Sequence, residues 1–439
     1  MCRSDRFINN SDYENIDNIK YVWYYIINGE VYFMDKYNEQ NEMIEEDEYF
    51  AKIVAEALAS DKAVEIKPMY DVKGNKIELV HDFELGDIVL GGFKSIVKKH
   101  GMKHYVDNYQ SGSKSKNIKI QIGVLDYLID EGRFQELIEA LPEAESLTIE
   151  LEEVKPTQDA TKLIKLEQML RDKNISMYIV RGLDSNTLYR LDDVLFAGKQ
   201  LDDWANEINS ATVDGKSLSP LEKFMYAYMI VQNRVGKECE FNAKLSRDPI
   251  AILNNDYCVC VGYASLLNEL CSRIGIQCTD KSVGVPGWHA INCSIIKDDK
   301  YGVDGLYYSD PTRDRKDLGN TLFACLLPSV EDVFDLYFND RDKCRELDDM
   351  GVGEKRLFPD AESLKRAQEN TKKIDYQNML DALFAVFRSK HQDRQDAIKA
   401  TNLYLDSSVK KVLKFPDSYK GNWVHDAAKA KGIIQEQKY

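Results

Sequence analysis

Two cysteines stand two residues apart in the segment CVCVGYA, residues 258–264, and His289 and Asp310 follow them in the chain. From Cys260 onward, apolar residues recur at helical spacing as far as Gly275, a residue typical of helix C-termini. Cys260 is therefore expected at a helix N-terminus, where the helix dipole and free N–H groups favour a thiolate. Such a sulfur attacks carbonyl carbons, and the same N–H groups can hold the resulting oxyanion.

A thiolate that performs acyl transfer also needs a proton carrier. His289 opens the segment HAINCSII, in which Ile291, Cys293 and Ile295 alternate on one face, so a strand is expected. The segment KDDKYGVDG then predicts a loop, and LYYSDPT predicts a second strand that ends in Asp310. A hairpin closed through that loop brings Asp310 roughly opposite His289, where a carboxylate can hold the imidazole tautomer and orientation.

The order of these segments and their residues resemble the motifs of the transglutaminase-like superfamily of cysteine enzymes. In that family a Cys lies in a CxGYA-like helix start, a His in an HAWN-like strand and an Asp in a DPT-like strand. The matching segments here are CVGYA, HAIN and DPT, and RDPIAIL, CSRIGI and LFACLLPSVED also look like the family. The resemblance covers about residues 200–335.

The resemblance implies a papain-like fold in which Cys260 is the nucleophile, His289 the general base and acid, and Asp310 the orienting carboxylate. The chain departs from the family pattern at Cys258, where Gly is usual, and at Ile291, where an aromatic residue is usual. An aromatic residue, Trp288, instead precedes the histidine. Trp288 and Tyr263 are the candidates for substrate contact.

The expected activity is acyl transfer at amide bonds of a protein or peptide substrate through a thioester, with no cofactor. Water as acceptor gives a protease or a glutamine deamidase, and an amine gives a transglutaminase. Hydrolysis is favoured because nothing outside the triad indicates an amine-donor site. The alternative is a non-catalytic transglutaminase-like binding or scaffold module, which predicts that Cys260 is unreactive.

Other uses of these residues are weaker. A metal site built from cysteines of this region and His289 lacks the paired CxxC knuckles of structural zinc sites. A CxC redox pair would be strained, and DDKYGVDG lacks EF-hand spacing. Cys271, Cys278 and Cys293 lie on apolar faces and are interpreted as packing residues.

The elements that position these residues belong to an expected α+β chain of three domains. Residues 1–198 are expected to form an α/β scaffold or recognition domain, with hairpin or turn signals at Asn28-Gly29 and at VKGNK, residues 72–76. Strand and helix patterns then alternate, which predicts βαβ units and a small parallel sheet. The expected strands are 118–125, 145–152 and 175–180, and the expected helices are 131–141 and 161–174.

Residues 185–200 are interpreted as a transition, followed by a helix start in which Ser219 caps, Pro220 takes the first position and Glu222 completes a capping box. Residues 199–345 form the expected catalytic domain. The charged residues 346–439 predict a helical C-terminal region whose charge runs are solvated faces.

Composition limits the partners. A net charge of -16 over 439 residues disfavours nucleic acid. No signal-like N-terminus and no run of about 18 apolar residues is visible, so no membrane association and a cytoplasmic location are expected. Nine scattered cysteines fit reduced thiols in that compartment. A protein exported by a specialised secretion route would have the same composition, and the sequence leaves the oligomeric state open.

Overall fold

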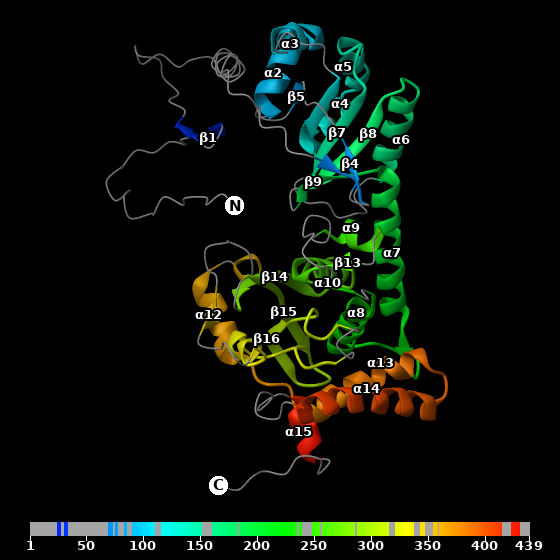
Figure 1. The fold of residues 1–439 in the computed structure, drawn as a ribbon, viewed down its shortest axis with the longest axis vertical. Coiled ribbons are helices and arrows are strands. Elements are labelled where there is room, and N and C mark those ends of the chain that lie inside the picture. Colours follow the sequence, from blue (N-terminus) through cyan, green and yellow to red (C-terminus); the bar gives the residue numbers. More distant parts are fainter. Residues whose placement is uncertain are drawn as a thin grey trace, which may run out of the picture. The chain divides into compact units, whose positions relative to one another are not determined.

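The fold is taken from a computed structural model of the chain, coloured along the sequence in Figure 1. The structure describes residues 24–27, 30–33, 69–72, 75–77, 83–85, 90–109, 116–151, 160–181, 184–234, 237–238, 248–254, 257–285, 288–315, 321–337, 343–346, 354–358, 360–414 and 423–430. No helix in these ranges is long and apolar enough to cross a bilayer. The contacts divide the chain into two compact units, residues 1–66 with 81–144, and residues 67–80 with 145–439.

The first unit contains an antiparallel hairpin and a parallel strand pair. The hairpin strands β1 (Tyr24–Ile27) and β2 (Glu30–Phe33) flank Asn28-Gly29 in the register that a two-residue turn requires, as predicted. Strand β5 (Phe83–Leu85) pairs in parallel with β6 (Asn117–Gln121). The helices among the described residues of this unit are α2 (Leu90–His100), α3 (Met102–Tyr109), α4 (Ile122–Asp130) and α5 (Phe134–Ala140).

The expected strand 118–125 is correct only in its first half. Strand β6 stops at Gln121, and α4 begins at Ile122. Val124, Leu125 and Leu128 are buried at spacings that place them on one helical face. A short apolar run does not by itself distinguish a buried strand from a buried helix, which explains the error.

The second unit opens with a mixed sheet. Its strands are β3 (Met69–Tyr70), β4 (Lys76–Ile77), β7 (Ser146–Leu151), β8 (Ser176–Arg181) and β9 (Asp184–Tyr189). Strands β7 and β8 are parallel and are joined through α6 (Ala160–Arg171), which confirms a βαβ unit. Strand β9 runs antiparallel to β8 and parallel to β3, and the VKGNK segment joins the antiparallel pair β3 and β4. The sheet is therefore mixed rather than purely parallel.

The interpretation of residues 185–200 as a transition is wrong. They form most of strand β9 and the first half of α7 (Leu191–Ser210), the long green helix on the right side of Figure 1. Buried Leu191, Val194, Ala197 and Leu201 continue one apolar face across the domain boundary expected at residue 198. That boundary therefore falls inside a continuous helix. The three-domain division itself stays a prediction.

A small hairpin, β10 (Thr212–Val213) and β11 (Lys216–Ser217), leads into α8 (Pro220–Arg234). Glu222 accepts the Ser219 N–H at 2.7 Å, which is half of the expected capping box. The other half is supplied differently, because Asp298 Oδ2 accepts the Leu221 N–H at 2.8 Å. The start of α8 is thus tied to the end of a strand far along the chain.

An antiparallel sheet follows, formed by β14 (Gln277–Gly284), β15 (His289–Asp298) and β16 (Val303–Ser309), with β17 (Arg345–Glu346) paired to the end of β14. Helix α10 (Cys260–Arg273) contacts β14 and β15, and α8 also contacts β15. The shorter elements of this region are β12 (Lys237–Glu238), β13 (Tyr257–Cys258), α9 (Pro249–Asn254), α11 (Val330–Phe334) and the 3-10 turn η5 (Glu354–Arg356).

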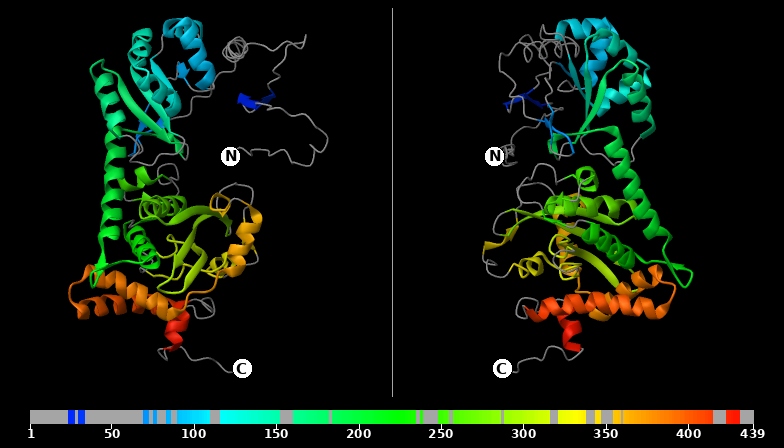
Figure 2. Two further views of the ribbon diagram at one scale, coloured as in Figure 1. Left: turned by 180° about the vertical axis from the view of Figure 1, so that it is seen from behind. Right: turned by 45° about the vertical axis from the view of Figure 1, so that its right-hand side comes forward.

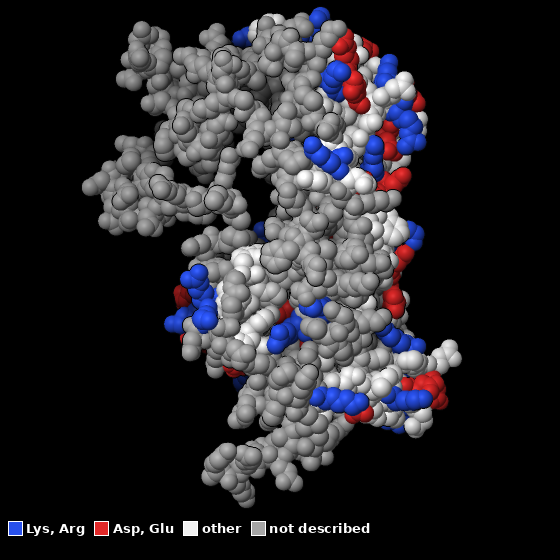
Figure 3. Space-filling view, viewed as in Figure 1, with Lys and Arg blue, Asp and Glu red and all other residues white. Residues whose placement is uncertain are grey.

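The C-terminal region is helical, as expected. It contains α12 (Ala361–Asn370), α13 (Tyr376–Lys390), α14 (Arg394–Lys414) and α15 (Trp423–Ala430). Figure 2 shows α13 and α14 side by side, and Figure 3 shows cationic and anionic atoms interspersed on the described part of this surface.

The solvated-face interpretation of the charge runs holds for α12, which has no buried residue, and for Asp381 and Lys390 of α13, which are exposed. It fails at Glu354, which is buried. Helix α13 buries Met379, Leu383 and Val386 and contacts α8. The Trp423 Nε1–H of α15 donates to the Leu322 carbonyl at 3.0 Å. The C-terminal helices are therefore packed into the second unit rather than appended to it.

Candidate active site

Cys260 is the first residue of α10, as the sequence predicts. The N-cap residue is Val259, and no side chain caps this end of the helix. The first intrahelical bond runs from the Tyr263 N–H to the Val259 carbonyl at 3.1 Å. The N–H groups of the first turn have no acceptor within an α-helix, so this end favours an anion beside Cys260.

The two cysteines of the CxC segment lie in opposite environments. Cys258 is fully buried, and burial with the nearby Cys260 raises the pKa of its thiol well above the ordinary value. Cys260 is only half-buried. Both are free thiols, so the structure contains no CxC disulfide. The second cysteine is the one placed for reaction.

His289 and Asp310 meet through the β15–β16 hairpin. Asn292 pairs with Ser309 in the strand register, which leaves Asp310 just beyond the end of β16 and close to the start of β15. The His289 Nε2 atom lies 2.9 Å from Asp310 Oδ2. The Asp310 backbone N–H also donates to the Ala324 carbonyl at 2.7 Å, which holds the end of the hairpin in place.

His289 forms a hydrogen bond with the Cys260 thiol as well. Its Nε2 atom faces Asp310, so Nδ1 is the nitrogen left for the sulfur. The carboxylate fixes the tautomer in which Nε2 carries a proton, because an ionised carboxylate only accepts hydrogen bonds. The structure thus brings all three predicted triad residues into one hydrogen-bonded chain.

The charges of these groups support one another. Burial raises the pKa of the Cys260 thiol, but the hydrogen bond and charge of His289 and the Ala290 N–H lower it below the ordinary value. Burial lowers the pKa of the His289 imidazole, but Asp310 and then Cys260 raise it to about 10. Each group therefore favours the charged form of the other, which stabilises a thiolate–imidazolium pair.

The Asp310 carboxylate, fully shielded from solvent, completes the pattern. Burial raises its pKa, but the charge and hydrogen bond of His289, then Tyr337 and the Arg313 N–H, lower it below the ordinary value. The carboxylate therefore stays ionised although it is buried.

Tyr337 was not predicted from the sequence. Its hydroxyl lies 2.9 Å from His289 Nε2 and 2.5 Å from Asp310 Oδ2. Its ring packs edge-on against the imidazole, with centroids 5.7 Å apart. Tyr337 follows the DPT segment by more than twenty residues, and a lone tyrosine in VFDLYF carries no sequence signal for such a role.

A second aspartate, Asp314, supports the loop around Asp310. Asp314 is buried and accepts the N–H groups of Phe323 and Ala324 at 3.1 and 2.9 Å. It also accepts the Tyr228 hydroxyl of α8 at 2.8 Å. Because Ala324 in turn accepts the Asp310 N–H, Asp314 positions the segment on which the triad carboxylate rests.

Asn292 links the nucleophile helix to the histidine strand. Its buried amide donates from β15 to the Ala264 carbonyl of α10 at 2.9 Å and to Asn268 Oδ1 at 2.8 Å. Helix α10 and strand β15 are thus held together close to Cys260 and His289.

The two candidates for substrate contact differ. Trp288 precedes His289 and has 43% of its surface exposed, so it is accessible to a substrate. The Tyr263 side chain is fully buried on α10. Its expected contact with substrate does not fit this burial, because the ring belongs to the apolar face that packs the helix into the core.

The remaining cysteines of this region fit their expected packing role. Cys271 and Cys293 are fully buried, and burial raises the pKa of both thiols. Cys278 is half-buried and donates to Asn268 Oδ1 at 3.0 Å. Among the described residues, no group of three or more His, Cys, Asp or Glu side chains is placed to hold a metal ion.

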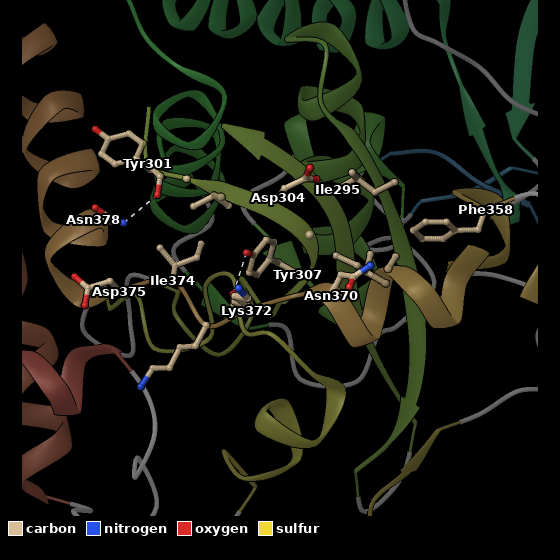
Figure 4. A pocket seen from close by; sticks show the side chains of 16 residues that line it. Ile295, Tyr301, Asp304, Tyr307, Phe358, Asn370, Lys372, Ile374, Asp375 and Asn378 are labelled. Atoms are coloured by element: carbon tan, nitrogen blue, oxygen red, sulfur yellow. Dashed lines mark hydrogen bonds between the residues drawn. The ribbon is translucent and has the colours of Figure 1, made fainter. Parts of the chain in front are cut away.

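A pocket of about 680 Å³ lies at the other end of the hairpin. Figure 4 shows that Tyr301, Tyr307 and Asn378 line it. The Tyr307 hydroxyl donates a hydrogen bond to the Lys372 carbonyl. Ile295, another lining residue, is six positions beyond His289 on β15, or about 20 Å along an extended strand. The pocket is therefore separate from the triad.

No protein-family model matches the chain, and a search of the curated proteins finds no match.

Proposed function

We propose that this chain is a cysteine-dependent enzyme that transfers acyl groups from amide bonds of a protein or peptide substrate. The observation that carries the proposal is the hydrogen-bonded chain Cys260–His289–Asp310, in which the pKa of the thiol is lowered and that of the imidazole is raised to about 10. Nucleophile, proton carrier and orienting carboxylate are the parts that acyl transfer requires.

The packing of α10 on the antiparallel sheet β14–β15–β16 supports a papain-like core of the transglutaminase-like type. In such a core the nucleophile begins a helix and the other two residues lie on adjacent strands. Cys260 begins α10, His289 begins β15 and Asp310 follows β16.

In the first half of the reaction, the Cys260 thiolate attacks the amide carbonyl carbon and forms a C–S bond. The N–H groups of the first turn of α10 stabilise the oxyanion. The His289 imidazolium donates its Nδ1 proton to the leaving nitrogen as the C–N bond breaks. A thioester and neutral His289 remain, with Asp310 still ionised.

In the second half, His289 takes a proton from the acceptor, which attacks the thioester carbonyl. Breaking the C–S bond restores the thiolate and imidazolium. Water as acceptor gives proteolysis or glutamine deamidation, and an amine gives transamidation. We favour water, because no feature of the sequence outside the triad indicates an amine-donor site.

A substrate survey tests this proposal. A peptide mixture from a proteolytic digest is incubated with the protein and a biotinylated primary amine, and mass spectrometry then scores new termini, glutamine-to-glutamate conversion and biotin incorporation. We expect one of these products with the wild type and none with Cys260→Ala. Equal products from both proteins would overturn the proposal. No product, together with an unreactive Cys260, would instead favour the non-catalytic module.

A further inference from the structure

Tyr337 adds a fourth side chain to the hydrogen-bonded chain around Asp310. The phenol donates to Asp310 Oδ2 at 2.5 Å, and its oxygen lies 2.9 Å from His289 Nε2 as an acceptor for the imidazole N–H. One hydroxyl thus contacts both charged partners of the Cys260 thiolate. Burial and then the Asp310 charge raise the pKa of Tyr337 well above its ordinary value, so the phenol keeps its proton.

The chain fixes this hydroxyl from two sides. Helix α11 is capped by Ser329, which accepts the Asp332 N–H at 3.2 Å, and the turn after the helix is closed by the bond of 2.9 Å from the Tyr337 N–H to the Phe334 carbonyl. From the Asp310 side, the Arg313 guanidinium donates to the Leu336 carbonyl at 2.5 Å and lies over the Tyr337 ring, 4.9 Å from its centroid.

Arg313 also closes the loop back to the carboxylate. Its backbone N–H lies 3.1 Å from the Asp310 carbonyl and 3.2 Å from Asp310 Oδ1. The same residue therefore holds the tyrosine through its side chain and Asp310 through its backbone. This arrangement sets the position of the phenol relative to the carboxylate.

The carboxylate needs such donors because it is fully buried. A buried carboxylate without hydrogen bonds would take up a proton, and a neutral Asp310 could no longer stabilise the His289 imidazolium. His289 and the Arg313 N–H supply two of its contacts, and the phenol supplies the third.

We propose that Tyr337 is a positioning residue for the acyl transfer proposed above. Its hydroxyl holds the Asp310 carboxylate ionised and directed at His289 Nε2, and it acts on Cys260 through these two residues. The inference rests on the proposed function, because it matters only if the Cys260–His289 pair reacts.

The direction of its effect follows from the groups that face Asp310. These are His289 on β15, Cys260 on α10, Tyr228 on α8, Arg313 after β16 and Tyr337 after α11. Removing the phenol hydroxyl takes a donor from the carboxylate and an acceptor from the imidazolium. Both charged forms are then less stable and the pKa of His289 falls, so the neutral thiol and imidazole compete with the thiolate–imidazolium pair and Cys260 becomes half thiolate only at a higher pH.

The test is the pH dependence of Cys260 alkylation by iodoacetamide in the full chain, scored by peptide mass spectrometry and requiring no substrate. For Tyr337→Phe we expect the half-maximal pH to rise by about one unit, the effect of losing one hydrogen bond to a charged group. Tyr308→Phe is the matched control, since the Tyr308 hydroxyl donates to another buried carboxylate, Glu354, at 2.8 Å. We expect its profile to match the wild type. A melting curve is recorded for each variant, and alkylation is measured at a temperature below the unfolding transition of every variant.

A double variant shows whether the tyrosine acts through Asp310. In an Asp310→Asn background, Tyr337→Phe should shift the half-maximal pH no further. A full shift in that background, or none in the wild-type background, would overturn the positioning role while a reactive Cys260 leaves the proposed function standing. A wild-type Cys260 that reacts only like an ordinary thiol would instead remove both proposals.

Discussion

Two buried polar clusters on the same antiparallel sheet use similar groups for different purposes. In one, Lys281 Nζ lies 2.6 Å from Glu354 Oε1, and the Tyr308 hydroxyl donates to the same oxygen at 2.8 Å. In the other, His289 and the Tyr337 hydroxyl both contact Asp310 Oδ2. Each cluster is thus a cation and a phenol on a buried carboxylate.

The two clusters differ in what the cationic side chain contacts besides its carboxylate. Lys281 and Glu354 have only 7% and 8% of their side chains exposed, and the pair ties η5 to β14. His289 turns its remaining nitrogen to the half-buried Cys260 at a helix N-terminus. The Lys281–Glu354 pair therefore joins two elements, whereas the His289–Asp310 pair ends at an accessible thiol and suits the acyl transfer proposed above.

The largest expected effect is the loss of the proton carrier. His289→Ala should reduce turnover of a substrate found in the survey by about 10²- to 10⁴-fold, the usual contribution of general acid–base catalysis. Asp310→Asn should leave a measurable residual rate, because it keeps much of the geometry. The loss should appear mainly in kcat, measured by steady-state kinetics. If His289→Ala turned over substrate at the wild-type rate, the cluster around Asp310 would have no more part in catalysis than the cluster around Glu354.

The cluster of Lys281, Glu354 and Tyr308, called the closed cluster below, should affect the free energy of unfolding rather than the reactivity of Cys260. Glu354→Ala leaves the Lys281 ammonium buried without its carboxylate, and such a change costs about 3 to 5 kcal/mol in free energy of unfolding. Denaturant titration measures this loss, and Cys260 alkylation in the folded variant should be unchanged. The double variant Lys281→Met/Glu354→Leu should recover much of the stability, because neither buried charge of the pair remains. Slower Cys260 alkylation in folded Glu354→Ala would show that the clusters are coupled.

The pH dependence of Cys260 alkylation tests whether His289 of the cluster around Asp310 controls the charge of the thiol. The pKa of Cys260 is lowered, so the wild-type rate should rise with pH at values below those of an ordinary thiol. In His289→Ala burial remains but the lowering charge is gone, so the half-maximal pH should rise. Turnover in the wild type should fall again near pH 10, where the imidazolium loses the proton it gives to the leaving group. An unchanged alkylation profile in His289→Ala would contradict the ion pair.

The placement of Cys260, His289 and Asp310 was predictable because these residues sit at local signals. Helical spacing and Gly275 placed Cys260 at a helix start, and alternation placed His289 on a strand. The closed cluster was not predictable, since Lys281 and Glu354 are 73 residues apart and nothing local pairs them. Tyr337 was missed for the same reason, being 27 residues from Asp310.

The fold shows the same limit. Period and caps predicted the start of α8 and the βαβ unit of β7 and β8, which depend on nearby residues. The strand–helix switch at Ile122 was misread, because a short apolar run is ambiguous until tertiary burial selects a partner. Helix α7 was missed although its buried residues recur at helical spacing. The cap at Leu221 comes from Asp298, 77 residues away, which no local pattern specifies.

The smallest expected effect concerns the link between α10 and the sheet. Asn292→Ala removes the two hydrogen bonds from β15 to Ala264 and Asn268, which should cost about 1 to 3 kcal/mol in free energy of unfolding. Because α10 then shifts more freely against β15, the Cys260–His289 hydrogen bond weakens. Alkylation at pH 7 should slow by less than about tenfold, the equivalent of one pKa unit.

The matched control is Asn378→Ala, which removes an asparagine hydrogen bond to the Tyr301 carbonyl at the pocket end of the hairpin. It should lower stability without changing alkylation, since that end lies far from Cys260. If both variants slow alkylation equally, the effect follows global stability. The contact of Asn292 with α10 would then not position Cys260 against His289. The geometry of the cluster of Cys260, His289 and Asp310 would be set by the β15–β16 hairpin and by Asp310 alone.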